Sequence, residues 1–114
     1  SNAEAVALVD GWPDWTARAA IVVGPTGSGK SHLTNVWRLK SGAVSVAAAE
    51  LGEGAVAEIE TSGAIAIEDL DRGIADERIF FHLLNLTKEK GHALLATSRT
   101  APGDLTVALP DLRS

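Results

Sequence analysis

Short apolar runs alternate with amphipathic stretches along the chain. The first half predicts a short helix over residues 2–9, a strand over 19–23 (AAIVV) and a helix over 30–40 with apolar residues at helical spacing. A Val- and Ala-rich strand over 43–48 and a helix over 55–61 follow. Strands without polar alternation are typical of parallel sheets that are buried on both faces.

The second half continues the alternation. A strand over 64–67 (AIAI) ends in acidic residues, and a helix over 76–90 follows, with acidic residues in its first turn and Gly91 after its last. A strand over 92–97 (HALLAT) comes next, and we expect irregular structure or short turns after Ser98. The order predicts one α/β unit, a three-layer αβα arrangement with a parallel sheet between helices.

Composition restricts the class of protein. The chain has 114 residues, 46% hydrophobic and 22% charged, which suits one small globular domain or part of a larger one. It has no Cys, which excludes disulfides and thiolate metal sites. Its net charge of −5 disfavours direct DNA binding. No apolar run approaches the ~20 residues of a membrane span, so we expect a cytoplasmic protein. The first residues, SNA, resemble a tag-cleavage scar, but a native origin stays open.

Residues 24–31 match the phosphate-loop pattern G-x-x-x-x-G-K-[ST] without deviation. Glycines let backbone N–H groups converge on phosphate oxygens, and the N-terminus of the following helix favours the same anion. A Gly-rich turn without phosphate chemistry is the alternative. We predict binding of ATP or ADP with Mg²⁺ through the following residues: Gly24, Pro25, Thr26, Gly27, Ser28, Gly29, Lys30 and Ser31, with Lys30 on the β/γ-phosphates and Ser31 on the metal.

Two carboxylates follow the strand over 64–67. In phosphate-loop NTPases a strand of this type delivers one acid to the Mg²⁺ shell and another to the attacking water. Glu68 and Asp69 are consecutive and face opposite sides of the predicted strand, so we expect them to have different roles. We predict Glu68 and Asp69 as catalytic residues, with Glu68 also serving as a metal ligand beside Ser31. An ordinary acidic turn is the alternative.

Polar residues also end the strand over 92–97. Such folds place a polar side chain near the γ-phosphate, so Ser98 is a candidate nucleotide-binding residue, although Thr and Ser commonly end strands for no such reason. The histidines form no metal constellation. Three charged residues are expected to be solvated: Asp71, Arg72 and Arg99.

Several segments together carry a family likeness. GPTGSGKSHL, IEDLD, FFHLLN, LLATSRTAPGDL and VALPDLRS resemble the AAA+ core of DnaA-related proteins, the bacterial replication initiators. VALPDLRS and the upstream WPDW are most similar to the Hda-type regulators of that family. The resemblance covers nearly the whole chain and implies that residues 24–31 are the Walker A loop and that Glu68 and Asp69 are the Walker B acids. Glu68 stands where DnaA has Asp, and Ser98 where DnaA has an acidic residue.

The resemblance also implies a role. Hda-type proteins act with the DNA sliding clamp to promote ATP hydrolysis by DnaA, and they lack a DNA-binding domain. By the same likeness, the arginine finger, the fifth strand and the helical lid are missing from residues 1–114, so we expect a partial AAA+ core with weak or no hydrolysis. A missing fifth strand would leave the first strand at an open sheet edge, where self-association is expected.

Two other functions compete with a replication regulator. A phosphate-loop kinase for small molecules usually carries an Arg-rich lid, whereas the Arg residues after the acidic strand show no cluster along the sequence. A protein-interaction module that has lost nucleotide binding is the other alternative. Titration with ADP and ATP separates it from the first function.

Overall fold

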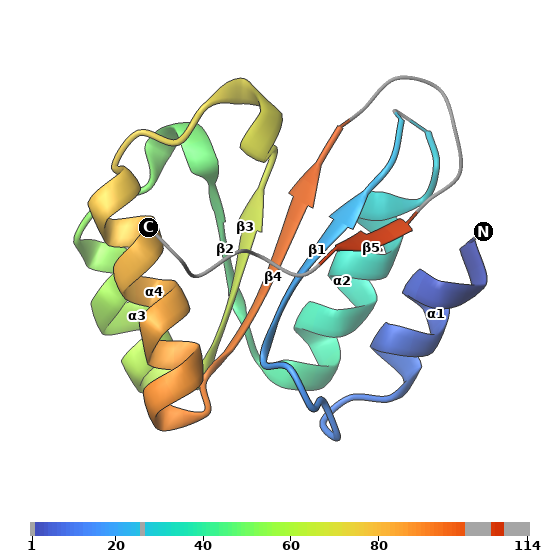
Figure 1. Ribbon diagram of the computed structural model, residues 1–114, viewed down its shortest axis with the longest axis horizontal. Coiled ribbons are helices and arrows are strands. Elements are labelled where there is room, and N and C mark those ends of the chain that lie inside the picture. Colours follow the sequence, from blue (N-terminus) through green and yellow to red (C-terminus); the bar gives the residue numbers. More distant parts are fainter. Residues whose placement is uncertain (1, 26, 100–105, 109–114) are drawn as a thin grey trace.

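The apolar runs form the strands of one mixed sheet. The computed structural model describes residues 2–25, 27–99 and 106–108. Its sheet has five strands in the order β2-β3-β4-β1-β5 (Figure 1). Four of them are parallel, and the last is antiparallel to β1. The bounds are β1 (Ala19–Val23), β2 (Val44–Ala47), β3 (Ala64–Glu68), β4 (Ala93–Ser98) and β5 (Thr106–Ala108).

The helices lie where helical spacing predicts them, within one or two residues at each end. They are α1 (Asn2–Asp10), α2 (Lys30–Ser41), α3 (Gly54–Ser62) and α4 (Glu77–Lys90), with single 3₁₀ turns η1 (Ala48–Glu50) and η2 (Leu70–Arg72). Local chemistry sets their ends. Asp76 caps α4 by accepting a hydrogen bond from the backbone N–H of Ile79. No helix in these described ranges has the length and apolarity needed to cross a bilayer.

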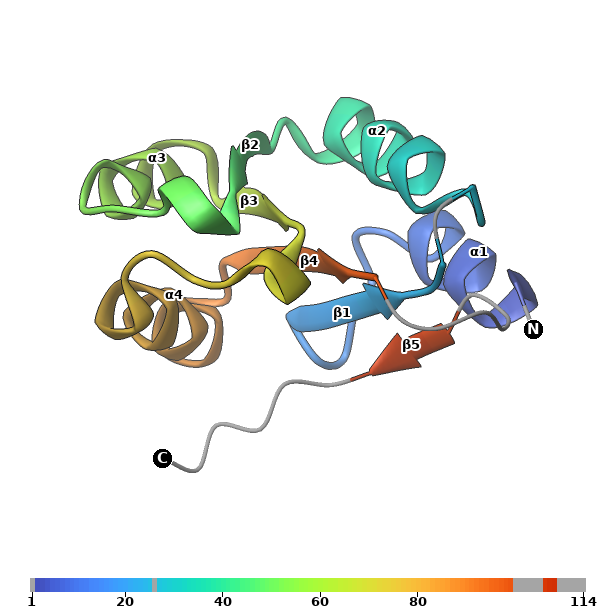
Figure 2. The same ribbon diagram turned by 90° about the horizontal axis from the view of Figure 1, so that it is seen from above.

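One face of the sheet is built from small residues and covered by α1 and α2 (Figures 1 and 2). Trp37 of α2 is fully buried there, and its ring stacks on Trp15 at a centroid distance of 5.4 Å. The strand residues beneath are mostly alanines, which leave room for the indole rings. They are Ala20, Ala64, Ala66 and Ala93. Bulky helix residues thus pack on small strand residues.

The opposite face carries large aliphatic residues and is covered by α3 and α4. Ile65 and Ile67 of β3 alternate with the alanines of the same strand and point to this side, as the two-residue period of a strand requires. They pack with Ile59 of α3 and with Leu83 and Leu84 of α4. Helices on both faces make the architecture compatible with a three-layer αβα fold.

The prediction that β1 lies at an open edge, without a fifth strand, is wrong. β5 pairs with β1 in antiparallel register, with Val107 opposite Val22. The backbone N–H of Val107 also donates to Glu4 of α1. Three residues carry too little periodicity to be recognised as a strand in the sequence. With β1 covered, self-association through its edge loses its structural basis.

Candidate functional site

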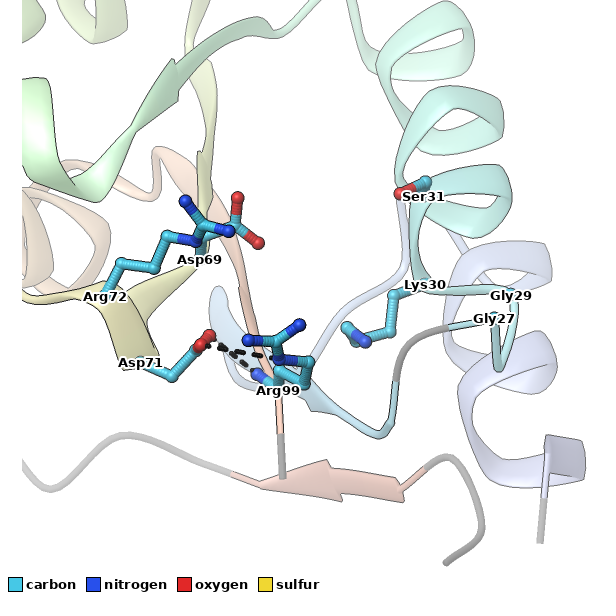
Figure 3. Close-up of a pocket in the computed structure, with 8 residues that line it drawn as sticks. All are labelled: Gly27, Gly29, Lys30, Ser31, Asp69, Asp71, Arg72 and Arg99. Atoms are coloured by element: carbon cyan, nitrogen blue, oxygen red, sulfur yellow. Dashed lines mark hydrogen bonds and ion pairs between the residues drawn. The ribbon is translucent and has the colours of Figure 1, made fainter. Parts of the chain in front are cut away.

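A cavity of about 400 Å³ opens where the carboxyl ends of β1, β3 and β4 meet the loop before α2 (Figure 3). Crevices at this end of a parallel sheet are the usual ligand sites of open α/β folds. The cavity is lined by Gly27, Gly29, Lys30, Ser31, Asp69, Asp71, Arg72 and Arg99. Four of these residues come from the Gly-rich loop and the start of α2.

Backbone conformation explains the glycines of the loop. Gly27 and Gly29 have φ of +80° and +100°, in the left-handed region that strains other residues. An added Cβ would meet nothing within 4 Å at either position, so conformation, not space, requires glycine. Gly29 is also the N-cap of α2, so this helix, whose first N–H groups have no partner within the helix, begins at the cavity. Thr26, predicted to belong to the same loop, lies outside the described residues.

The ammonium of Lys30 lies on the inside of the loop. Its Nζ donates to the carbonyl oxygens of Gly24 at 2.6 Å and Pro25 at 2.9 Å. An ammonium has three donors, so one remains for another acceptor. The hydroxyl of Ser28 is buried and has no hydrogen-bond partner in the described part of the chain. Ser28 itself is not among the residues that line the cavity, so its predicted contact with a nucleotide stays a prediction.

The two predicted acids separate in the structure. Asp69 lines the cavity, and its backbone is left-handed with φ 63° and ψ 54°. Its N–H donates to the Thr97 hydroxyl at the end of β4. Glu68 instead accepts a hydrogen bond of 2.6 Å from Ser45 of β2 and does not line the cavity. The structure therefore brings Asp69, and not Glu68, to the loop.

Ser98 contacts the Gly-rich loop through its backbone. Its carbonyl accepts a hydrogen bond from the N–H of Gly24 at 3.2 Å, which fixes the start of the loop to the end of β4. Its side chain is not among the groups that line the cavity. The predicted contact of Ser98 with a nucleotide stays a prediction.

Sequence reasoning missed three cavity residues because it treated them as solvated charges. Asp71 and Arg72 lie in η2, directly after β3, and Arg99 follows β4. The backbone N–H of Arg99 donates to Asp71 at 2.8 Å, and this bond, with a smaller effect of the guanidinium, holds the pKa of Asp71 below its usual range. Their positions just after neighbouring parallel strands were the available signal.

No family model and no curated protein matches the chain. The cavity itself therefore carries the functional argument. Among the described residues there is no group of three or more His, Cys, Asp or Glu side chains that could hold a metal ion. A cation at this place would need oxygen ligands from its substrate and from water as well as from the protein.

Proposed function

We propose that the chain binds a nucleoside diphosphate or triphosphate, ADP or ATP, with Mg²⁺ in this cavity. One observation carries the proposal: the Lys30 ammonium, the left-handed glycines and the start of α2 line the same cavity as Asp69. Backbone N–H groups and an ammonium suit the phosphates, whereas a carboxylate suits the cation that accompanies them. A phosphate-loop NTPase core is the fold that fits this combination.

Each loop residue would contact a different part of the phosphate chain. The N–H groups of Gly27 and Gly29 are donors for bridging and non-bridging oxygens. Lys30 would keep its bonds to the loop carbonyls and direct its remaining proton to the β- or γ-phosphate. Ser28, which does not line the cavity, would have to turn its buried hydroxyl toward the phosphates to take part.

The residues present fit a magnesium ion in the manner of nucleotide sites. Mg²⁺ keeps several waters and takes few protein ligands together with phosphate oxygens, and when bound it neutralises charge on the phosphates. Ser31 would be a direct ligand, and Asp69 would hold a metal-bound water. Glu68 is the other predicted ligand, and it would have to exchange its bond with Ser45 to take part.

We further propose that the chain is the nucleotide-binding core of a DnaA-related AAA+ regulator of replication initiation. Support comes from the motifs that resemble Hda-type proteins and from the net charge of −5, which favours protein partners over DNA. Its partners would be DnaA and the DNA sliding clamp. Hydrolysis by the isolated chain would be weak, because in NTPases of this kind an arginine finger supplied by a neighbouring protein raises the rate by about 10³–10⁵.

Calorimetric titration with MgADP and MgATP tests nucleotide binding, and mass spectrometry of the freshly purified protein tests for a retained nucleotide. We expect saturable binding of one nucleotide per chain, lost in Lys30→Ala. Absence of binding by both nucleotides would favour an interaction module instead.

A separate experiment tests the role in replication. DnaA loaded with ATP is incubated with DNA-bound sliding clamp, with and without the chain, and phosphate release is followed. We expect the chain to raise phosphate release from DnaA in the presence of the clamp and to need bound nucleotide for doing so. Steady ATP turnover by the chain alone, abolished by Lys30→Ala, would contradict the expected weak hydrolysis.

A further inference from the structure

Asp71 and Arg99 form a contact across the mouth of the cavity (Figure 3). The backbone N–H of Arg99 donates to Asp71 Oδ1 at 2.8 Å, and the guanidinium Nε lies 3.9 Å from Oδ2. The side chain of Arg99 is 51% exposed, that of Asp71 24%. Asp71 therefore contacts the backbone of Arg99 directly and its guanidinium at longer range.

Two neighbouring hydrogen bonds explain why Arg99 lies beside the loop. Gly24 donates its N–H to the carbonyl of Ser98, so the next residue, Arg99, lies beside the start of the loop. Asp69 donates its N–H to Thr97, which ties the end of β3 to β4 and brings the turn that contains Asp71 alongside. The position of Arg99 thus follows from the packing of three adjacent strands.

The charges that line the cavity favour a highly charged anion. Lys30, Arg72 and Arg99 are cationic, whereas Asp69 and Asp71 are anionic. The lining is therefore cationic on balance in a chain whose net charge is −5. Lys30 and the loop supply positive charge for a diphosphate. The two further cationic groups, Arg72 and Arg99, suit the charge of an additional phosphate. Guanidinium groups bind phosphate through two parallel N–H bonds, so an arginine that lines the cavity suits a terminal phosphate.

We propose that Arg99, oriented by Asp71, binds the terminal phosphate of a nucleoside triphosphate and so makes the site discriminate triphosphate from diphosphate. This inference rests on the proposed nucleotide binding. Arg99 would be the binding residue and Asp71 a positioning residue. Asp71 accepts from the backbone N–H of Arg99 and holds the guanidinium near the cavity, and the weak ion pair between them is exchanged for phosphate contacts when a triphosphate binds.

The test compares calorimetric affinities of the whole chain for MgADP and for the magnesium complex of a non-hydrolysable ATP analogue. In Arg99→Ala we expect the analogue to bind about tenfold to a hundredfold more weakly, which is the range for a lost charge-assisted hydrogen bond. The affinity for ADP should change by less than about twofold. Arg99→Gln provides a second variant, and circular dichroism verifies that each variant folds. Arg78→Ala is the matched control, since Arg78 is an exposed arginine of α4 outside the cavity.

Variants of Asp71 separate positioning from charge. Asp71→Asn retains an acceptor for the N–H of Arg99, so we expect it to preserve the preference for the analogue. Asp71→Ala removes the acceptor and should reduce that preference, measured as the ratio of the affinity for the analogue to the affinity for ADP. The ratio of the two affinities is a readout that a purely structural role would not alter.

The outcomes distinguish the two proposals. If the wild type binds ADP and the analogue but Arg99→Ala weakens both equally or neither, Arg99 is not a terminal-phosphate residue and nucleotide binding stands. An equal effect of Arg78→Ala on the analogue would show that general charge is responsible. If the wild type binds neither nucleotide, the proposed function and this inference both fail.

Discussion

Ser45 of β2 donates a hydrogen bond to Glu68 of β3 at 2.6 Å, whereas the next residue, Asp69, lines the Gly-rich cavity. Two consecutive carboxylates are thereby given different surroundings. Consecutive strand residues face opposite sides, and the left-handed backbone of Asp69 also turns the chain out of the strand direction after Glu68.

This separation predicts different effects of two isosteric changes on Mg²⁺-dependent nucleotide binding. Mg²⁺ should raise the affinity for ADP in the wild type. Asp69→Asn should reduce this increase by about tenfold, because a carboxylate at the cation is lost. Glu68→Gln should reduce the increase much less. Calorimetry with ADP in Mg²⁺ and in EDTA measures both. The reverse order would restore Glu68 as the metal residue.

Lys30 is predicted to be essential for binding and dispensable for folding. Lys30→Ala should reduce ADP affinity about tenfold to a hundredfold, because a charge-assisted contact to phosphate is removed. Lys88→Ala, an exposed change on α4, is the control for loss of one positive charge. A thermal-shift series with increasing MgADP, in which binding raises the melting temperature, provides the measurement. A shift retained in Lys30→Ala would contradict a phosphate role for this residue.

The buried tryptophan of α2 is predicted to dominate the stability of its face of the sheet. Trp37 has no exposed surface and packs against Trp12 and Trp15. Trp37→Ala should lower the free energy of unfolding by about 3–5 kcal/mol, measured by urea denaturation. Leu39 of the same helix is 88% exposed, so Leu39→Ala should change it by less than about 0.5 kcal/mol. Similar effects of the two variants would contradict the packing described for α2.

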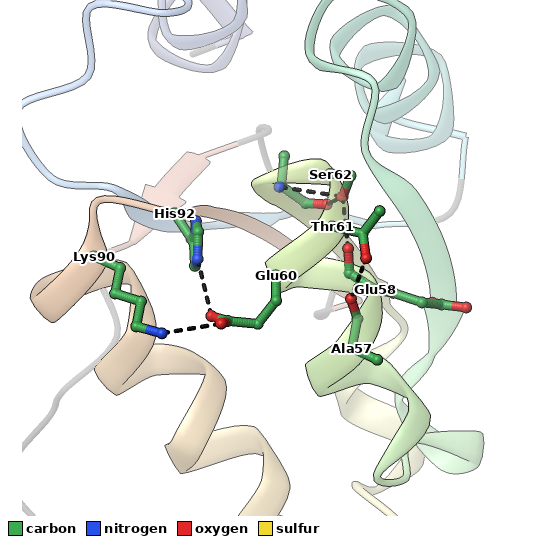
Figure 4. A network of polar contacts seen from close by, with 8 residues as sticks. Ala57, Glu58, Glu60, Thr61, Ser62, Lys90 and His92 are labelled. Carbon is green, nitrogen blue, oxygen red and sulfur yellow. Dashed lines mark hydrogen bonds and ion pairs between the residues drawn. The ribbon is translucent and has the colours of Figure 1, made fainter.

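Acid stability is predicted to depend on Glu60. Its carboxylate accepts from Lys90 at 2.9 Å and lies 3.0 Å from Nε2 of His92 (Figure 4). The hydrogen bond from Lys90, aided by that with His92, holds the pKa of Glu60 below the ordinary value of 4.5. A carboxyl group whose pKa is lower in the folded state stabilises the fold above its unfolded pKa and loses that effect as pH falls through the folded value.

The melting temperature of Glu60→Gln, compared with wild type across acidic pH, tests this. The wild type should be more stable above about pH 5, and the difference should be lost as the pH falls from there through the lowered, folded-state pKa of Glu60. Glu58→Gln is the control, since Glu58 lies on the same helix and points away from Lys90 and His92 (Figure 4). A difference that persists unchanged at pH 3 would assign the effect to packing.

The order of strands and helices could be predicted from the sequence because the signals are local. The run AAIVV, the Gly residues after helices and the acidic residues at the start of the helix over 76–90 each act within a few residues, and the elements they predict are confirmed. The loop pattern over residues 24–31 is local too, and Lys30 and Ser31 line the cavity, while their contacts with a nucleotide stay a prediction. By contrast, β5 pairs with a strand far away in the sequence, and its three residues carry no period of their own.

The rest of the site was decided by tertiary structure. The strand order β3-β4-β1 places the turn after β3 beside the residue after β4 and both beside the loop after β1, so Asp71 and Arg99 meet although they are 28 residues apart. The sequence alone determined the alternation of elements and the chemistry of the Gly-rich loop. Only the packing of parallel strands decided which charges share its cavity, because contacts between strand ends depend on their order in the sheet and not on their distance along the chain.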